Sequence, residues 1–396
     1  MNGLLAAIAL VGVTVHTGSG PPLENGTVLI EGNRIAAVGP SLPLPDGTEV
    51  LRLDGAVVTA GLIDCDSRLG LTEVVAEPSA VEAAIGEEDD PVRAALRVTD
   101  GFDPSSFVIP VARLGGLTSA VIMPRGGLVS GQAAWIDLIE REPIRRDAVA
   151  LLVRAKRLGK GAGGRTRAFH RLREIFEDAR LYRANRGPFI ARKLRVLSLP
   201  AADLEVIARA LDRELLIVFE ADRAADIRTV LGLVRDHRLR AALLGGAEAW
   251  TLASEIAAAG VPVLMDPIDN LPASFDSLRI RSDGAVRLHR AGVRVAFTLR
   301  GEAHRAARLR HVAGNAVAEG FPYQAALAAI TRVPAEIFGL KDAGVVEPGA
   351  LANLVVWNGD PLELRSWPIR IFIRGRATPL RSRQDLLTER YSEQQP

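Results

Sequence analysis

The feature of this sequence that most constrains its fold is a series of short apolar segments that alternate with amphipathic ones between residues 117 and 300. The amphipathic segments, such as ADLEVIARALDR and DIRTVLGLVRDH, carry apolar residues at helical spacing. Apolar strands that alternate with helices are typical of a parallel sheet covered by helices on both faces. The expected strands are Leu117–Pro124, Ala148–Val153, Leu194–Leu199, Leu215–Ala221, Ala241–Gly246, Pro262–Pro267 and Val293–Arg300.

Seven or eight such units over about 280 residues predict an α/β fold, a (β/α)8 TIM-like barrel. A doubly wound open sheet is the alternative. No GxGxxG or GxxxxGK[ST] motif follows a strand, so neither nucleotide-binding signature supports that alternative. The glycine-rich segment Gly159–Gly164 has a different spacing and is interpreted as a loop.

Both ends of the chain read as β-structure. The first part contains GVTVHTG, GTVLIEGNRIAAVG and EVLRLDGAVVTAGLID, and the last part contains GALANLVVWNGDPL and IRIFIRGRA. These are short β-branched runs separated by turn dipeptides such as Asn-Gly and Asp-Gly. We expect residues 1–60 and 345–380 to pair into one small composite β-sandwich domain, residues 61–344 to form the barrel, and residues 381–396 to form a C-terminal tail.

Composition excludes several functional classes. The chain has 396 residues, with 49 basic and 47 acidic side chains and a net charge of +2. This balance gives no general field for nucleic acid or an anionic membrane, so we expect neither as a partner. No apolar run reaches the ~18–20 residues that span a bilayer. The apolar segment Leu4–Val15 lacks a preceding Lys or Arg and a following cleavage site, which favours a first β-strand over a secretion signal and predicts a cytoplasmic protein.

Cysteine usage excludes two kinds of site. Cys65 is the only cysteine, so the chain can form neither an internal disulfide nor a cysteine-rich zinc site. A lone thiol is more often a small buried apolar group than a nucleophile. Its acidic neighbours, Asp64 and Asp66, should also disfavour the thiolate.

Three stretches resemble a known family. GTVLIEGNRIAAVG followed by GAVVTAGLIDCDSRLGL is similar to the entry of the amidohydrolase superfamily, close to imidazolonepropionase-like metal-dependent hydrolases. AALAAITRVPAEIFGLKDAGVVEPGALANLVVWNGDPL resembles its exit, and GGLTSAVIMPRGGLVSGQ resembles its second-strand region. The resemblance covers roughly Ala9 to Arg376. It implies a metal-binding (β/α)8 barrel with a β-sandwich made from both termini.

The resemblance also implies a chemistry. Members of the superfamily bind one or two metal ions, such as zinc, through a His-x-His on strand one, a Lys or Glu further on, a His on each of strands five and six, and an Asp on strand eight. The metal lowers the pKa of a bound water to about 7 and polarises the substrate carbonyl, and the strand-eight Asp acts as general base. The family reaction is hydrolysis of carbon–nitrogen bonds other than peptide bonds.

This sequence departs from that pattern at every ligand position that can be placed. Asp66 and Arg68 replace the two histidines of strand one, Glu220 replaces the histidine of strand five, Gly245 that of strand six, and Arg300 the strand-eight Asp; Asp222 stands where close relatives often carry a further His. The bridging Lys or Glu is not placed. None of the six histidines falls at a ligand position. We therefore expect no catalytic residues and no metal cofactor.

The replacements suggest what occupies the metal cavity instead. Arg68 and Arg300 could neutralise Asp66 and Glu220, because a guanidinium pairs well with carboxylates. Two alternatives are an alignment error of one or two residues, with these groups facing solvent, and neutral loss of the ligands without organised pairing. Asp66 and Glu220 could also form an acid–base pair, but nearby arginines should keep both carboxylates ionised.

Two functional hypotheses follow. The first is a pseudoenzyme with a binding or structural role, which could hold a small anionic ligand on Arg68 and Arg300, form a homo-oligomer or associate with an active relative. The second is an active hydrolase of cyclic amide or amidine-type substrates that uses a non-standard site. The two hypotheses make opposite predictions for catalytic activity.

Overall fold

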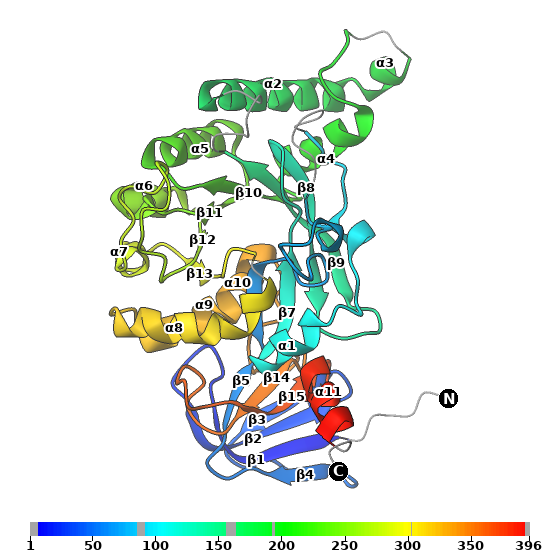
Figure 1. Cartoon of the computed structure of the whole chain (residues 1–396), viewed down its shortest axis with the longest axis vertical. Helices are drawn as coiled ribbons and strands as arrows, with labels where there is room; N and C mark the ends of the chain where they lie inside the picture. Colours follow the sequence, from blue (N-terminus) through cyan, green and yellow to red (C-terminus); the bar gives the residue numbers. More distant parts are fainter. Residues whose placement is uncertain (1–6, 85–91, 156–163, 192–194, 302, 393–396) are drawn as a thin grey trace.

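The computed structural model describes residues 7–84, 92–155, 164–191, 195–301 and 303–392. Two β-sheets organise it. A barrel sheet surrounded by helices occupies the centre, and a second sheet built from both ends of the chain lies below it (Figure 1). The expected loop Gly159–Gly164 and the first residues of the segment Leu4–Val15 fall mostly outside the described residues.

The lower sheet joins the two ends of the chain. Its order is β16-β15-β14-β5-β1-β2-β3, with β4 paired to β1. Strand β5 runs antiparallel to β14, and this pairing connects the N-terminal and C-terminal segments. The strands are β1 Ile8–Val15, β2 Leu23–Glu31, β3 Arg34–Gly39, β4 Glu49–Arg52, β5 Val57–Ala60, β14 Leu354–Trp357, β15 Pro368–Ile373 and β16 Arg376–Ala377. The terminal sheet is therefore mixed, and it has its own apolar core.

The central sheet confirms the α/β barrel. Eight strands follow one another in the order β13-β12-β11-β10-β9-β8-β7-β6. Where the first and last strands meet, the hydroxyl of Thr298 donates to Asp64 at 2.7 Å. The strands are β6 Leu62–Ser67, β7 Leu117–Ile122, β8 Val129–Asp137, β9 Ile144–Arg154, β10 Leu216–Ala221, β11 Ala241–Gly245, β12 Val263–Met265 and β13 Val295–Phe297. The result is a nearly closed eight-stranded barrel.

One expected strand is wrong and one was missed. The described part of Leu194–Leu199 forms no strand; instead, the amide of Ser198 donates to Asp178 on the adjacent helix at 2.8 Å. The eighth strand is β8, which runs antiparallel to both β7 and β9. Its sequence contains Ser, Gly and Gln, so it lacks the continuous apolar run used to find the others. The sheet is consequently not parallel throughout.

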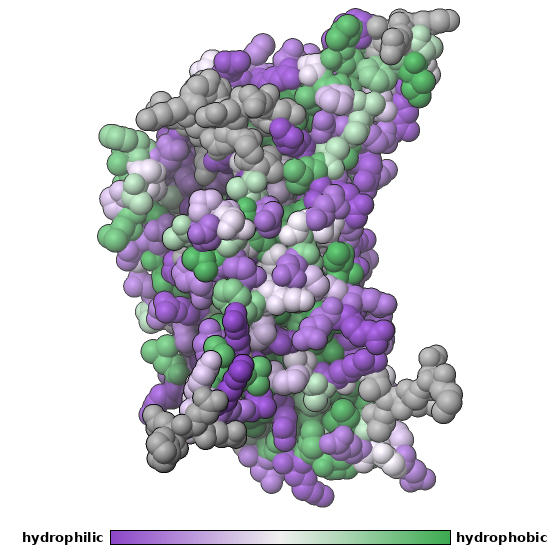
Figure 2. All heavy atoms as spheres, turned by 45° about the vertical axis from the view of Figure 1, so that its right-hand side comes forward, coloured by the Kyte–Doolittle hydropathy of each residue, from purple (hydrophilic) through white to green (hydrophobic). Residues whose placement is uncertain are grey.

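Helices and short 3-10 turns surround the barrel, apart from α11, which is drawn at the level of the terminal sheet (Figure 1). The helices are α1 Val108–Leu114, α2 Arg165–Ala184, α3 Arg186–Ile190, α4 Ala201–Leu211, α5 Ala224–His237, α6 Ala253–Ala259, α7 Gly284–Arg290, α8 Leu309–Ala318, α9 Tyr323–Ala329, α10 Arg332–Phe338 and α11 Arg383–Ser392. The 3-10 turns are Pro78–Ala80, Val98–Gly101, Ala249–Leu252 and Ala303–Arg308. None of the helices in the described parts of the chain has the length and apolarity that a bilayer span requires. On the face in Figure 2, hydrophilic and apolar side chains are interspersed.

The barrel interior is apolar and closed at one end by a helix. Inward side chains of the strands pack with Ile337 and Phe338 of α10, and both are almost fully buried. Cys65 belongs to this interior core and has no exposed surface, as expected for a lone thiol. Burial, followed by the charges of Asp64 and Asp66, raises the pKa of Cys65 well above its usual value. The thiol is therefore neutral and has a packing role.

A buried polar network joins the barrel to the terminal sheet. Asp137, at the end of β8, has no exposed surface. Its carboxylate accepts from Ser119 at 2.8 Å, from Asn353 at 3.2 Å and from Arg374 at 2.7 Å. Buried carboxylates are stable only when paired or hydrogen-bonded, so this network fixes how the two sheets meet.

The contact between α1 and the turn Ala303–Arg308 provides a test of the packing. A Cβ on Gly115 would lie 2.3 Å from the carbonyl oxygen of Ala307 and 2.5 Å from its Cα. We expect Gly115→Ala to lower the free energy of unfolding by more than about 2 kcal/mol, because backbone must move. Gly232→Ala is the control, since its Cβ would meet nothing within 4 Å in helix α5. That change should be neutral or stabilising by up to about 1 kcal/mol. Equal urea-unfolding curves for the two variants would contradict the packing.

Candidate functional site

The sequence-predicted positions lie at one edge of the barrel. Parallel strands place their carboxyl ends together, and these ends carry the site in barrels of this kind. Glu220 and Gly245 lie near the ends of β10 and β11, and Asp222 follows β10. Asp66 lies near the end of β6 and Arg68 directly follows it, while Arg300 follows β13.

Arg300 connects two of the predicted carboxylates. Its Nη2 lies 3.2 Å from Asp222 Oδ2 and 3.7 Å from Glu220 Oε1. The side chains of Glu220 and Asp222 are only 9% and 13% exposed, respectively. Burial would lower the pKa of Arg300, but the charges of Asp222 and Glu220 outweigh it and raise that pKa. Arg300 is consequently a fixed cation held between two acids.

Gly245 leaves room for this ion pair. A Cβ at this position would lie 2.4 Å from Asp222 Oδ1 and 3.1 Å from Arg300 Nη2. The backbone φ of Gly245 is +95°, which residues with a side chain rarely adopt. The space that a side chain would need at this strand end is therefore filled by the Asp222–Arg300 pair.

Asp66 pairs with an arginine that the sequence analysis did not select. Its fully buried carboxylate forms an ion pair with Arg125, whose side chain is 15% exposed. Burial would lower the pKa of Arg125, but Asp66 and Glu220 raise it against opposition from Arg300. Arg125 lies in the turn between β7 and β8, within the segment GGLTSAVIMPRGGLVSGQ that resembles the family's second-strand region. Its position after a strand end was the available signal.

Arg154 was also missed, because strand β9 is longer than expected. The strand runs from Ile144 to Arg154 in place of Ala148–Val153, and its last residue is in register with Glu220 on β10. Nε of Arg154 lies 3.4 Å from Glu220 Oε2. Glu220 thus lies between Arg154 and Arg300.

Arg68 lies beside Arg125 at the same edge of the barrel. Its Nε and the Nη2 of Arg125 each lie 3.0 Å from the point that a Cβ on Gly301 would occupy. Arg68 is half-buried, so it is not a freely solvated side chain. Seven charged side chains therefore share this edge of the barrel. We call them the charged cluster: Asp66, Arg68, Arg125, Arg154, Glu220, Asp222 and Arg300.

Below the charged cluster, Asp64 is 2% exposed and accepts the hydroxyl of Thr298 at 2.7 Å. Burial is the main reason that the pKa of Asp64 is raised from 3.8 to about 7, and the charge of Asp66 adds to it.

The amide of Arg300 in turn donates to the Thr298 hydroxyl at 3.3 Å. Arg300 has a φ of +55°, a left-handed conformation that costs a residue with a side chain about 1 kcal/mol or more. Its ion pairs and this hydrogen bond hold it there.

Comparisons with known proteins agree with this architecture. A protein-family model described as "Amidohydrolase family" matches residues 205–379 of this chain. An amidohydrolase from Thermotoga maritima MSB8 superposes with a TM-score of 0.85 at 24% identity, covering 94% of this chain and all of that one. Residues 205–379 therefore match the amidohydrolase family in sequence, and the chain as a whole has the fold of an amidohydrolase.

Two further proteins are similar to this chain, one in structure and one in sequence. An N-isopropylammelide isopropylaminohydrolase from Burkholderia multivorans ATCC 17616 superposes with a TM-score of 0.53 at 18% identity, covering 94% of this chain and 98% of that chain. Amidohydrolase tasK of Hapsidospora irregularis is 22% identical over 392 residues. That alignment covers 89% of this chain but only 40% of the relative, so the chain spans less than half of that protein.

The charged cluster does not fit the metal that the amidohydrolase resemblance implies. Among the described residues, no group of three or more His, Cys, Asp or Glu side chains is placed to hold a metal ion. The carboxylates at the predicted ligand positions already bind guanidinium groups. Three of the histidines instead contact aromatic rings: His16 with Tyr323, His237 with Phe176 and His289 with Phe321. We therefore derive no chemical step through a metal.

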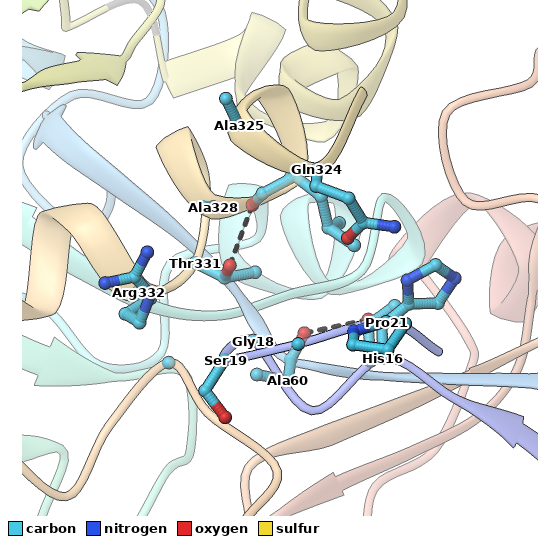
Figure 3. Close-up of a pocket in the computed structure, with 14 residues that line it drawn as sticks. His16, Gly18, Ser19, Pro21, Ala60, Gln324, Ala325, Ala328, Thr331 and Arg332 are labelled. Atoms are coloured by element: carbon cyan, nitrogen blue, oxygen red, sulfur yellow. Dashed lines mark hydrogen bonds between the residues drawn. The ribbon is translucent and has the colours of Figure 1, made fainter. Parts of the chain in front are cut away.

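A separate pocket lies between the terminal sheet and the barrel helices. It measures about 620 Å³ and is lined by residues of the β1–β2 connection, β5, α9 and the start of α10 (Figure 3). His16, Gln324 and Thr331 are among its polar residues, and none of the predicted site residues lines it. It is therefore distinct from the charged cluster.

The pairing of Arg300 can be tested by its removal. Arg300→Ala would leave Glu220 and Asp222 poorly compensated, so we expect it to lower the free energy of unfolding by about 3 kcal/mol. This is the lower end of the usual cost, because the Arg300 side chain is 29% exposed. The control is Arg235→Ala, because Arg235 is 80% exposed beside Asp236 and should change stability by less than about 0.5 kcal/mol. An unchanged melting temperature for Arg300→Ala would show that the pair is not buried.

Asp64 predicts a particular pH dependence. Its pKa is about 7 in the folded chain and 3.8 when solvated, so the folded state binds its proton more tightly. Tighter binding of this proton stabilises the folded state. The full stabilisation is present below about pH 4, and it is lost as the pH rises to about 7. Asp64→Asn removes that loss while keeping an acceptor for Thr298. The stability of the variant relative to the native chain should thus increase by up to about 4 kcal/mol between pH 4 and 7, and then level off.

Urea unfolding at a series of pH values measures this difference. Asp236→Asn, at a carboxylate that is 58% exposed, is the control and should give a nearly pH-independent difference. Parallel curves for Asp64→Asn and the native chain would mean that Asp64 titrates normally.

Proposed function

We propose that this amidohydrolase-family protein is a pseudoenzyme, whose charged cluster occupies the place of the family's metal centre and whose retained role is binding or structural. The observation that carries the proposal is the guanidinium of Arg300 between Glu220 and Asp222, at distances of 3.7 and 3.2 Å. In the family pattern described above, the strand-eight position holds a metal-binding Asp. Here the same position provides a cation.

Electrostatics supports the proposal. A divalent cation at this edge would approach Arg300 and Arg125, which are both partly or largely buried. Two unit charges of like sign at 4 Å repel by about 4 kcal/mol at an effective dielectric constant of ~20, and a divalent ion roughly doubles this. Displacing a guanidinium would in addition leave it unpaired in a buried site. Metal binding would therefore require the cluster to be broken.

A second candidate is an active hydrolase of cyclic amide or amidine-type substrates without a metal. It is favoured by one observation, the buried carboxyl of Asp64 with its pKa near 7, since a group with that pKa can act as a general acid or base at neutral pH. Against it, Asp64 is 2% exposed and already accepts from Thr298. A catalytic group must reach the proton that it transfers, and the Asp64 carboxyl faces the strand junction.

Metal analysis tests the proposal directly. Protein purified without chelator is expected to contain far less than one equivalent of zinc, manganese, iron, cobalt or nickel, whether or not zinc is added to the growth medium. A known zinc enzyme carried through the same purification is the control. Stoichiometric metal in the native chain, removable by dialysis against a chelator, would overturn the pseudoenzyme assignment, because the proposal requires the charged cluster to exclude a divalent cation.

Hydrolysis of a panel of cyclic amides and amidines separates the two candidates. The pseudoenzyme gives no turnover above buffer. Turnover that persists in chelator and disappears in Asp64→Asn would support the metal-free hydrolase instead.

A further inference from the structure

The opposite end of the barrel carries a second, separate concentration of arginines. Arg213, Arg240 and Arg294 come just before β10, β11 and β13, respectively. These strands run parallel in the sheet order β10-β11-β12-β13, so their amino ends lie at one edge. The three arginines line a pocket of about 270 Å³ there, together with Glu336 and Ile337 of α10.

The end of α10 positions two guanidinium groups beside this pocket. Arg240 Nη2 donates to the carbonyl of Ile337 at 2.8 Å, and Arg146 Nη1 donates to that of Gly339 at 3.3 Å. A Cβ on Gly339 would lie 3.2 Å from Arg240 and 3.7 Å from Arg146. The two guanidinium groups therefore converge on one glycine, and each uses only part of its five N–H donors on a carbonyl.

The arginines around this pocket lack acidic partners. Among the described residues, no carboxylate lies within 4 Å of a guanidinium nitrogen of Arg146, Arg213, Arg240 or Arg294, and Arg213 and Arg294 make no side-chain hydrogen bond. The acid in the pocket wall, Glu336, is paired with Arg332 at 2.5 Å. This is unexpected in a chain with 47 acidic and 49 basic residues, where acids are abundant enough for most arginines.

The pKa of Arg240 reflects the same imbalance. Burial, followed by the positive charges of Arg146 and Arg213, lowers it from its usual value. Like charges held together without a counter-charge repel each other, and an anion would relieve that repulsion. The pocket is thus a preformed positive site.

We propose that this arginine pocket binds a small polyanion, of the chemical class of phosphate esters and pyrophosphates. Guanidinium groups recognise phosphate oxygens through paired, charge-assisted hydrogen bonds, and several of them around one cavity favour a ligand with two or more negative charges. The pocket volume suits a small molecule or the charged end of a larger one. The site uses none of the residues of the charged cluster, so it is independent of the proposed function.

Calorimetric titration of the full chain with inorganic pyrophosphate tests the site. The test variant is Arg213→Ala/Arg294→Ala, which removes two exposed guanidinium groups that make no side-chain hydrogen bonds and should leave folding unchanged. The matched control is Arg370→Ala/Arg376→Ala, which removes the same charge from exposed positions in the terminal sheet. We expect the test variant to bind at least about tenfold more weakly and the control to bind as the native chain does.

Two further titrations define the ligand class. Citrate, a tricarboxylate of similar size, should bind more weakly than pyrophosphate if phosphate geometry is recognised, and raised salt should weaken both. Absence of pyrophosphate binding to the native chain would overturn the proposal. Equal weakening in both double variants would also overturn it, because the effect would then be one of net charge. Loss of folding in the test variant, detected by circular dichroism, would be answered by the single variant Arg294→Gln, for which weaker binding is again required.

Discussion

The contact on which the functional edge of this barrel depends is the ion pair of Arg300 with Asp222 and Glu220. It connects the end of β13 to the end of β10 across the barrel opening, at 3.2 and 3.7 Å. Replacing buried ion pairs by apolar side chains is often neutral or stabilising, so the pair is not needed for stability as such. Once the pair is present, however, removal of either partner would destabilise the fold, because the remaining buried charge would be unpaired. Arg125 with Asp66 and Arg154 with Glu220 extend the same dependence around the edge.

The same principle operates where the barrel meets the terminal sheet. Asp137 is fully buried and is satisfied by Arg374 and Asn353 from the C-terminal segment and by Ser119 from β7. The apolar cores of the barrel and the terminal sheet supply most of the burial, but apolar contacts are non-directional. The hydrogen bonds of the buried carboxylate at their junction are directional, so they fix how the two sheets are oriented. In both places a charge in a dry environment selects one arrangement of elements.

How far the sequence predicted this molecule differs between its parts. Strands with continuous apolar runs, such as the one ending at Ala221, were found because burial on both faces requires such runs. Strand β8 was missed because Gly131 and Gln132 interrupt its pattern, and residues 195–199 were mistaken for a strand because Leu197 and Leu199 face inward from an irregular segment. An apolar residue at a given position indicates only that the position is buried. A strand also requires a neighbouring strand to pair with, and the tertiary fold decides whether one is present.

The sequence by itself determined the barrel class, the pairing of the two chain ends and the loss of imidazole at the ligand positions, since each is a matter of residue type and order. Only the tertiary structure decided which charges meet. Asp66 pairs with Arg125, 59 residues away, and Arg300 meets Asp222, 78 residues away. The partner of a buried charge is whichever opposite charge the packed strands bring within a few ångströms. That distance depends on the register of strands and the length of turns, which residue types alone do not specify.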